Sequence, residues 1–189
     1  MEEGYWLRRI VHMSAPLLLI YYAIPDFIFG VGKWLGLVLI LIIVLFFDLM
    51  RLAFQWRIIG FRDYEYRRLS AAAWAALGFT LIFLLFPLEI AAPAVLGMAL
   101  VDPMIGELRR RESRLYPLLP AIFYYVLASL CFYYIIGFDW IIMLACLIAT
   151  ILAIGVERAR TKFVDDDFLM LVVPACALAI TLSLTSSLS

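Results

Sequence analysis

Acidic residues stand at the ends of several long apolar runs in this chain, where a lipid phase would meet water. Asp102 closes one run, Glu157 closes another, and residues 165–167 are three consecutive aspartates that open the last run. One acid at a helix start is an ordinary cap, whereas three in a row concentrate enough charge to bind a divalent cation. Carboxylate oxygens without a second histidine favour Mg²⁺ over zinc. The predicted magnesium ligands are Asp102, Glu157, Asp166 and Asp167.

The chain's one histidine stands at the start of the first apolar run, beside two arginines. Arg8 and Arg9 precede His12 by four and three residues, so the three side chains share one face of a helix. One interpretation is an interfacial histidine with arginines that extend to water. The other is an anion-binding cluster with the histidine above it.

The segment after Asp102 combines a proline, a glycine and a basic run. Pro103 removes an amide donor and is expected to bend or break the helix there. Gly106 is expected to let the backbone come close to a ligand. More positive charge follows than membrane topology requires, from Arg109, Arg110, Arg111 and Arg114. We interpret this segment as half of a metal and phosphate site.

These side chains must be positioned by helices in a membrane. The chain has 189 residues, is 67% hydrophobic and has a mean hydropathy of +1.05, which is more apolar surface than a soluble domain of this size can hide. The apolar runs are continuous rather than alternating, so strands are excluded and helices satisfy the backbone. We predict an all-α bundle of seven transmembrane helices that forms one domain, residues 1–189. The seven spans of about 20 residues each are 10–29, 34–53, 69–86, 88–105, 116–136, 140–156 and 168–187.

The basic residues predict how these spans are oriented. If the spans alternate in direction, all but one of the 15 Lys and Arg residues fall on the side of the N-terminus, and Lys33 falls on the other. Cytoplasmic loops carry the Lys and Arg excess, so the N-terminus is predicted to be cytoplasmic and the C-terminus extracytoplasmic. We therefore expect a multi-pass protein of the cell membrane, with an oligomer left open. A formal net charge of zero is not typical of a nucleic-acid-binding protein.

Loop length and composition suggest how the spans pack. The predicted loops opposite the N-terminus are short, so spans 1 and 2, 3 and 4, and 5 and 6 are expected to form antiparallel hairpins. Spans 3 and 4 are rich in alanine and glycine, which favours close packing at the centre of the bundle; a groove for a lipid chain is the alternative. Asp48 precedes Arg51 by three residues inside span 2, and this pair is either functional or structural.

The predicted topology places these acids and arginines at one membrane surface. Converging carboxylates and guanidinium groups are what phosphoryl transfer from a nucleotide–metal complex requires, because they neutralise and align the phosphates. The acceptor would arrive from the lipid, so we expect an amphiphile with a hydroxyl head group.

Four short motifs follow one another along most of the chain. They are Arg8-Arg9 with His12, Arg62-Asp63-Tyr64-Glu65 before Leu69-Ser70-Ala71, Val101-Asp102-Pro103 with Gly106, and Glu157 followed by Asp166-Asp167 and Pro174. Their order and spacing resemble those of the dolichol, polyprenol and phytol kinase family. Three features differ from that family: Val101 stands where it has a glycine, its glycine-rich segment after the central Asp is missing, and an acid replaces the asparagine beside its late Asp.

The resemblance implies a shortened or divergent kinase that phosphorylates a long-chain isoprenoid alcohol of the dolichol, polyprenol or geranylgeraniol type. It further implies CTP as co-substrate, Mg²⁺ as cofactor and a site at the cytoplasmic face. The expected catalytic residues are His12, Glu65 and Asp102, with His12 or Glu65 as the base. The expected nucleotide-binding residues are Arg8, Arg9, Arg62, Gly106 and Arg109.

Three other functions stay open from the sequence. A carrier of lipids or small solutes would use acids within the spans as coupling sites, for which Asp48 and Glu89 are the candidates. A cytidylyltransferase of lipid phosphates would share the use of CTP, Mg²⁺ and a lipid. In a membrane scaffold, every charge would serve topology alone.

Overall fold

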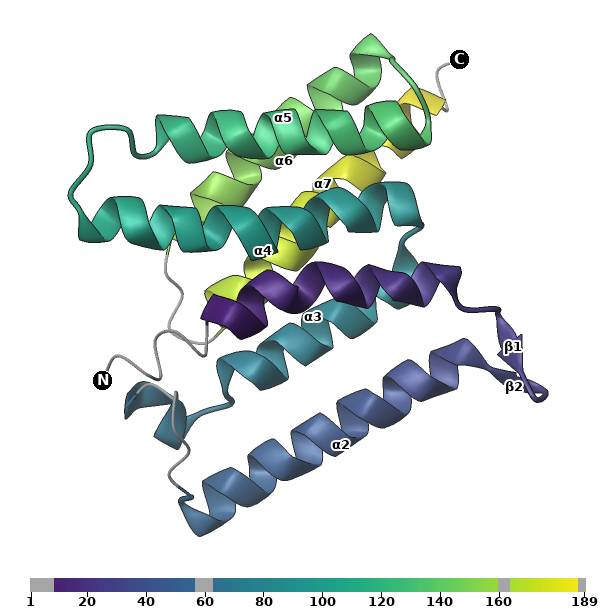
Figure 1. Ribbon diagram of the computed structural model, residues 1–189, viewed down its shortest axis with the longest axis vertical. Coiled ribbons are helices and arrows are strands. Elements are labelled where there is room, and N and C mark those ends of the chain that lie inside the picture. Colours follow the sequence, from purple (N-terminus) through teal and green to yellow (C-terminus); the bar gives the residue numbers. More distant parts are fainter. Residues whose placement is uncertain (1–8, 57–62, 160–163, 187–189) are drawn as a thin grey trace.

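Helices make up nearly all of the protein, as the computed structural model in Figure 1 shows for residues 9–56, 63–159 and 164–186. Residues 9–14 are helical and continue into the 3₁₀ helix η1 (Ala15–Ala23). The other elements are β1 (Phe27–Ile28), β2 (Val31–Gly32), α2 (Lys33–Phe54), η2 (Asp63–Arg67), α3 (Ala71–Leu85), α4 (Leu88–Arg110), α5 (Leu118–Ile135), α6 (Trp140–Ala159) and α7 (Asp166–Ser186). The predicted helical class is confirmed for the described residues, apart from one small hairpin.

Five helices in the described part of the chain are long and apolar enough to cross a membrane: α2, α4, α5, α6 and α7. α3 has 15 residues. At about 1.5 Å per residue it reaches about 22 Å, which is short of a hydrocarbon core of about 30 Å. The structure therefore supports a multi-helix membrane protein. The count of seven spans and the side on which each terminus lies stay predictions.

The predicted first span, residues 10–29, is wrong at its end. Helical structure stops with η1, and β1 then pairs antiparallel with β2. Pro25 explains the stop, because the residue before a proline is pushed out of the helical region; Ile24 is extended, with φ −76° and ψ 132°. Phe29 and Gly30 turn the hairpin with φ values of 51° and 79°, the left-handed conformation that tight hairpin turns need.

α4 continues through Pro103 to Arg110, so of the predicted bend or break at this proline the break is wrong, and the predicted span end at Ile105 comes about one turn too early. A proline removes one backbone hydrogen bond, and a helix tolerates this loss when neighbouring helices pack around it. α4 does so twice, because Pro93 also lies inside it. Asp102 therefore lies within the helix, about two turns before its end.

The centre of the bundle is α4, which packs against η1, α5 and α7 (Figure 1). Gly97 of α4 is buried, and a Cβ added there would lie 2.1 Å from Cε2 of Tyr124 on α5. Close packing is thus the role of this glycine. α3 instead packs mainly on α2 and α7, where Leu171 lies beside Gly78. The prediction that spans 3 and 4 form the packed centre together is therefore wrong for α3.

Asp48 and Arg51 form a buried pair that ties the end of α2 to the segment before α3. Arg51 Nε donates to Asp48 Oδ1 at 2.8 Å. The two terminal nitrogens of Arg51 donate to the carbonyl oxygens of Glu65 and Arg68, at 2.9 and 3.0 Å. The other Asp48 oxygen accepts from the Ser70 amide at 2.9 Å. These contacts support the structural interpretation of the pair.

Candidate metal and anion site

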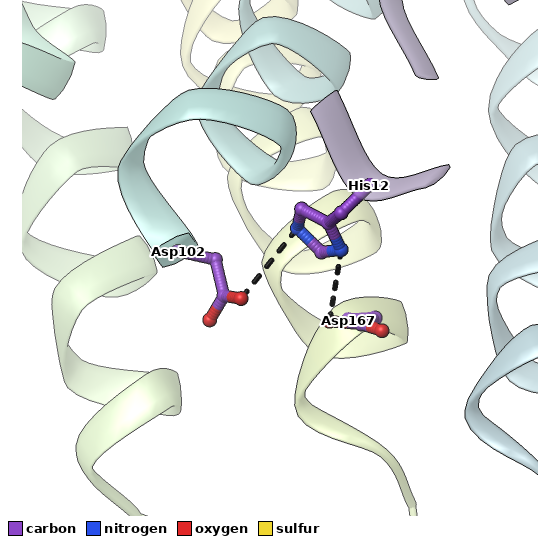
Figure 2. Close-up of side chains that lie close together, drawn as sticks. All are labelled: His12, Asp102 and Asp167. Carbon is purple, nitrogen blue, oxygen red and sulfur yellow. Dashed lines mark ion pairs between the residues drawn. The ribbon is translucent and has the colours of Figure 1, made fainter. Parts of the chain in front are cut away.

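His12 lies between two aspartates that come from different helices, as Figure 2 shows. Its Nε2 is 3.5 Å from Oδ2 of Asp102 on α4, and its Nδ1 is 3.8 Å from Oδ1 of Asp167 in the first turn of α7. The His12 and Asp167 side chains are 10% and 8% exposed, so little water reaches them. The three residues meet because η1 and α7 both pack against α4.

The hydrogen bond of His12 limits where its ring carries a proton. Nε2 lies 2.8 Å from the carbonyl oxygen of Met98, so Nε2 bears a hydrogen and donates it. In a neutral ring, Nδ1 then holds a lone pair, which faces the Asp167 carboxylate 3.8 Å away. Two acceptors that face each other are stabilised by a proton on Nδ1 or by a cation between them. This side of the site is therefore suited to hold a proton or a metal ion.

Asp102 also belongs to a second group of acids. One carboxylate oxygen from each of Asp102, Glu157 and Asp166 lies within 4.8 Å of the other two, and the same limit holds among His12, Asp102 and Asp167. Two oxygens on one Mg²⁺ stand about 3–4 Å apart, because each lies about 2.1 Å from the metal. Small side-chain rotations would close either group around a cation. The structure thus brings together the four acids that the sequence proposes as ligands, from α4, α6 and α7.

Arg109 holds Glu157 at the edge of this cluster. Its Nη1 donates to Glu157 Oε1 at 2.6 Å, and its Nη2 donates to the Tyr116 hydroxyl oxygen at 2.6 Å. The guanidinium also lies 4.8 Å from the centre of the Tyr116 ring, which is a cation–π distance. Arg109 thus binds a potential metal ligand, and its predicted contact with a phosphate stays a prediction. There it offsets the free-energy cost of burying a carboxylate that is only 5% exposed.

The Asp165 carboxyl lies beside the cluster and is also buried. Burial and the negative charges of Asp167 and Asp166 raise the pKa of Asp165 to about 7. Arg68 Nη2 lies 4.0 Å from Asp165 Oδ2, the outer limit of an ion pair. Residues 165–167 also form a third group of closely spaced ligand atoms. Negative charge is therefore concentrated here, and a bound cation would lower the repulsion.

Three predicted site residues lie outside these groups in the described part of the chain: Arg9, which lies 3.7 Å from Glu107, and Glu65 and Gly106. The Glu65 carboxylate accepts from the Ala71 amide at 3.4 Å and so binds the first turn of α3. A Cβ added to Gly106 would meet no protein atom within 4 Å, so internal packing does not require a glycine there. The predicted residues that fall outside the described ranges are Arg8 and Arg62.

Glu107 is a contact residue that the four motifs do not identify. It accepts from Arg110 at 2.9 Å and from Arg111 at 2.6 Å, and Arg9 Nη1 lies 3.7 Å from its Oε2. The three- and four-residue spacing on a helix is a sequence signal for the first two partners. The contact with Arg9 and the role of Tyr116 depend on tertiary packing and have no local signal.

No protein-family model, no curated protein and no solved structure matches this chain. The resemblance to isoprenoid-alcohol kinases therefore rests on the sequence motifs alone. A functional assignment depends on the chemistry of the residues that converge around Asp102.

Proposed function

We propose that this protein is an integral-membrane kinase that transfers a phosphoryl group to a long-chain isoprenoid alcohol at the cytoplasmic membrane face. CTP is the expected phosphate donor, and Mg²⁺ is the expected cofactor. The observation that carries the proposal is the position of Asp102. It belongs to one group of potential ligands with His12 and Asp167, and to another with Glu157 and Asp166. One carboxylate shared between two potential cation positions is suited to hold a metal–triphosphate complex.

In the proposed reaction, the hydroxyl oxygen of the alcohol forms a bond to the γ-phosphorus of CTP. The bond between that phosphorus and the β–γ bridging oxygen breaks, CDP leaves, and the hydroxyl proton passes to a base. The transition state is loose, so most of the rate enhancement comes from alignment and charge neutralisation. Asp102 and the three predicted ligands around it would hold Mg²⁺, whose charge supplies part of that neutralisation.

His12 is the better candidate for the base. Its Nδ1 faces the Asp167 carboxylate at 3.8 Å, so that carboxylate would stabilise the imidazolium formed when His12 takes a proton. Glu65 accepts instead from the Ala71 amide at the start of α3. Arg109 would position Glu157 and leave direct phosphate contacts to the other predicted residues, Arg8, Arg9, Arg62 and Gly106.

The class of acceptor follows from the setting of the site. The acids are carried by α4, α6 and α7, which are apolar enough to cross a membrane. An acceptor dissolved in the bilayer would reach them from the side, and a long-chain alcohol partitions there. The isoprenoid class and the choice of CTP rest on the four motifs.

A transfer assay with the purified protein in lipid nanodiscs tests the proposal. We expect γ-³²P-labelled CTP and geranylgeraniol to give a labelled lipid with Mg²⁺ and none with EDTA. Asp102→Asn should lower the rate at least about 100-fold, because it removes a charged ligand from both groups. The control is Asp26→Asn, the same change at an exposed aspartate that pairs with Lys33, and it should keep the wild-type rate.

The same assay separates the proposal from other functions. Labelled lipid and CDP indicate a kinase, whereas a cytidylyltransferase would give labelled pyrophosphate and a CDP-lipid only after a lipid phosphate is added as the acceptor. The proposal fails if no nucleoside triphosphate gives a labelled lipid, or if Asp102→Asn is fully active. The carrier alternative has less support, because Asp48 is occupied by Arg51 and Ser70, and Glu89 lies in the first turn of α4.

A further inference from the structure

A groove of about 260 Å³ opens between α4 and the N-terminal helical segment, residues 9–14. This segment continues into η1, which packs along α4 (Figure 1). The apolar walls of the groove are formed by Met13, Ala99, Leu100, Pro103, Met104 and Leu108. Two charged side chains also line it, Arg9 and Glu107. The groove is thus apolar along most of its length and charged at one place.

The groove lies on a different side of α4 from the acid cluster. Glu107 is five residues beyond Asp102, and at 3.6 residues per turn this places the two side chains about 140° apart around the helix axis. Arg109, which binds Glu157 of the cluster, stands only about 20° from Asp102. The groove is therefore separate from the proposed metal site, and its occupant has to be inferred from its own walls and charges.

Three arginines surround the one carboxylate that lines the groove. Glu107 accepts from Arg110 at 2.9 Å and from Arg111 at 2.6 Å, and Arg9 Nη1 lies 3.7 Å from its Oε2. Three guanidinium groups carry about fifteen N–H donors, whereas one carboxylate accepts about four hydrogen bonds. Three positive charges against one negative charge leave an excess of two among these four residues. The side chains of Arg110 and Arg111 are also 65% and 71% exposed, so an anion can reach them.

The charged residues stand at one end of the groove. Ala99 and Leu108 are nine residues apart, which corresponds to about 14 Å along α4. Glu107 lies at the Leu108 end, where α4 approaches its last residue, Arg110. The other end is apolar, and α4 is apolar enough to cross a membrane. This arrangement matches a membrane lipid with a negatively charged head group at Glu107 and its arginines and a hydrocarbon chain that extends toward Ala99.

We propose that this groove binds an anionic phospholipid of the surrounding membrane, with its phosphate at Arg9, Arg110 and Arg111 and one acyl chain along α4. Basic pockets between transmembrane helices are typical sites for anionic lipid head groups. A phosphate accepts charge-assisted hydrogen bonds from guanidinium groups, and Glu107 holds those groups together. The groove is smaller than the roughly 300–1,000 Å³ of sites for drug-sized ligands, so it holds a segment of a single chain.

Selectivity between two lipids that differ only in their head group tests the proposal. The full-length protein is placed in phosphatidylcholine nanodiscs that contain a small fraction of a phospholipid with a diazirine in one acyl chain. One sample contains the phosphatidylglycerol form of this probe, and the other contains the phosphatidylcholine form with the same chains. Mass spectrometry after irradiation maps the labelled peptides.

We expect the phosphatidylglycerol probe to label residues 99–108 and Met13 several-fold more than the phosphatidylcholine probe. The chains pack equally well in both lipids, so the difference comes from the head group. At exposed positions of α5 such as Leu130, the two probes should label equally. About 1 M NaCl should reduce the preference in the groove, because it shortens the Debye length to about 3 Å.

The double variant Arg110→Gln/Arg111→Gln should lower the groove preference to near one. Both side chains are exposed, so the fold is not expected to depend on them. The matched control is Arg114→Gln/Arg158→Gln, which removes two exposed arginines from the same predicted membrane surface but away from Glu107. It should keep most of the preference.

Three results would overturn the inference. Equal labelling of the groove by the two probes would show ordinary boundary lipid. A preference that survives in Arg110→Gln/Arg111→Gln would show that these arginines do not bind the head group. Equal losses in the two double variants would indicate a general attraction to the basic surface rather than a site. No sample contains nucleotide or Mg²⁺, so the outcome is independent of the proposed kinase activity.

Discussion

Arg109 Nη1 donates to Glu157 Oε1 at 2.6 Å, and this contact joins the last turn of α4 to the last turn of α6. Asp102 also lies on α4, so this contact fixes the position of Glu157 relative to Asp102, and both are proposed ligands. Tyr116 completes the arrangement by accepting from the other terminal nitrogen of Arg109. The geometry of the acid cluster is therefore supported by an ion pair outside it, in the way that residues behind a metal centre orient its ligands.

Glu157→Gln should weaken metal binding. The amide keeps the size of the side chain, but it removes the charge that a divalent cation needs. We expect the affinity for Mn²⁺, a spectroscopic substitute for Mg²⁺, to fall at least about tenfold in an electron paramagnetic resonance titration. Glu112→Gln, at an exposed position past the end of α4, is the matched control. An unchanged Mn²⁺ affinity in Glu157→Gln would exclude this residue as a ligand.

Tyr116→Phe should weaken metal binding by a smaller factor without unfolding the protein. The change removes the hydroxyl that accepts from Arg109 and keeps the ring beneath the guanidinium. Because Arg109 acts through Glu157, we expect Mn²⁺ affinity to fall by up to about tenfold. Tyr134→Phe, at a position that is 81% exposed, should have no effect. A lower unfolding temperature with unchanged Mn²⁺ affinity would show that Tyr116 serves stability alone.

Arg51→Met should destabilise the fold strongly. It leaves the buried Asp48 carboxylate without the guanidinium that neutralises it, a change that typically costs about 3–5 kcal/mol of unfolding free energy. Asp48→Asn in the same chain should restore part of the loss, because no buried charge then stays behind. Thermal unfolding in detergent measures both variants, with Arg158→Met at an exposed position as the control. A double variant no more stable than Arg51→Met would argue against the ion pair as the cause.

Gly97→Ala should destabilise the contact between α4 and α5. The new Cβ would stand 2.1 Å from Cε2 of Tyr124, so the ring must move, and such overpacking costs about 1–3 kcal/mol. Gly155→Ala is the matched control: this helical glycine has no protein atom within 4 Å of an added Cβ, and alanine should stabilise it by up to about 1 kcal/mol. Both effects are measured by thermal unfolding in detergent.

The double variant Gly97→Ala/Tyr124→Leu tests the cause of that clash. Leucine removes the ring that the new methyl group meets, so part of the stability lost in Gly97→Ala should return. If the double variant loses the sum of the two single effects, the strain arises elsewhere, because independent sites add.

The helices were predictable from the chain because their hydrogen bonds are local. A continuous apolar run satisfies its own backbone in lipid, and this determines α2 and α4 to α7 to within a few residues of their observed bounds. The errors occur where a local rule competes with packing. Pro103 does not end α4, which continues for about two more turns to Arg110. Pro25 does mark the end of a helix: the residue before it is extended, and the chain continues into β1.

The candidate metal site likewise has one part that the sequence predicts and one part that depends on helix packing. Counting charges along the chain places Asp102, Glu157 and residues 165–167 at helix ends on one side of the predicted bundle, but a helix end can face any neighbour. The structure joins them because α7 packs against both α4 and α6. Glu65 does not join these acids, because it binds the start of α3 beside the Asp48–Arg51 pair.

The sequence by itself determined the helical class and placed Glu157 and residues 165–167 at helix ends, because apolar length and charge position are properties of neighbouring residues. Asp102, which it also placed at a helix end, lies about two turns inside α4. Only the tertiary structure decided that His12 lies between Asp102 and Asp167, and that Arg109 reaches Glu157 and Tyr116. These contacts depend on the rotation of each helix about its axis. That rotation follows from how small residues such as Gly97 let the helices approach, which no single segment encodes.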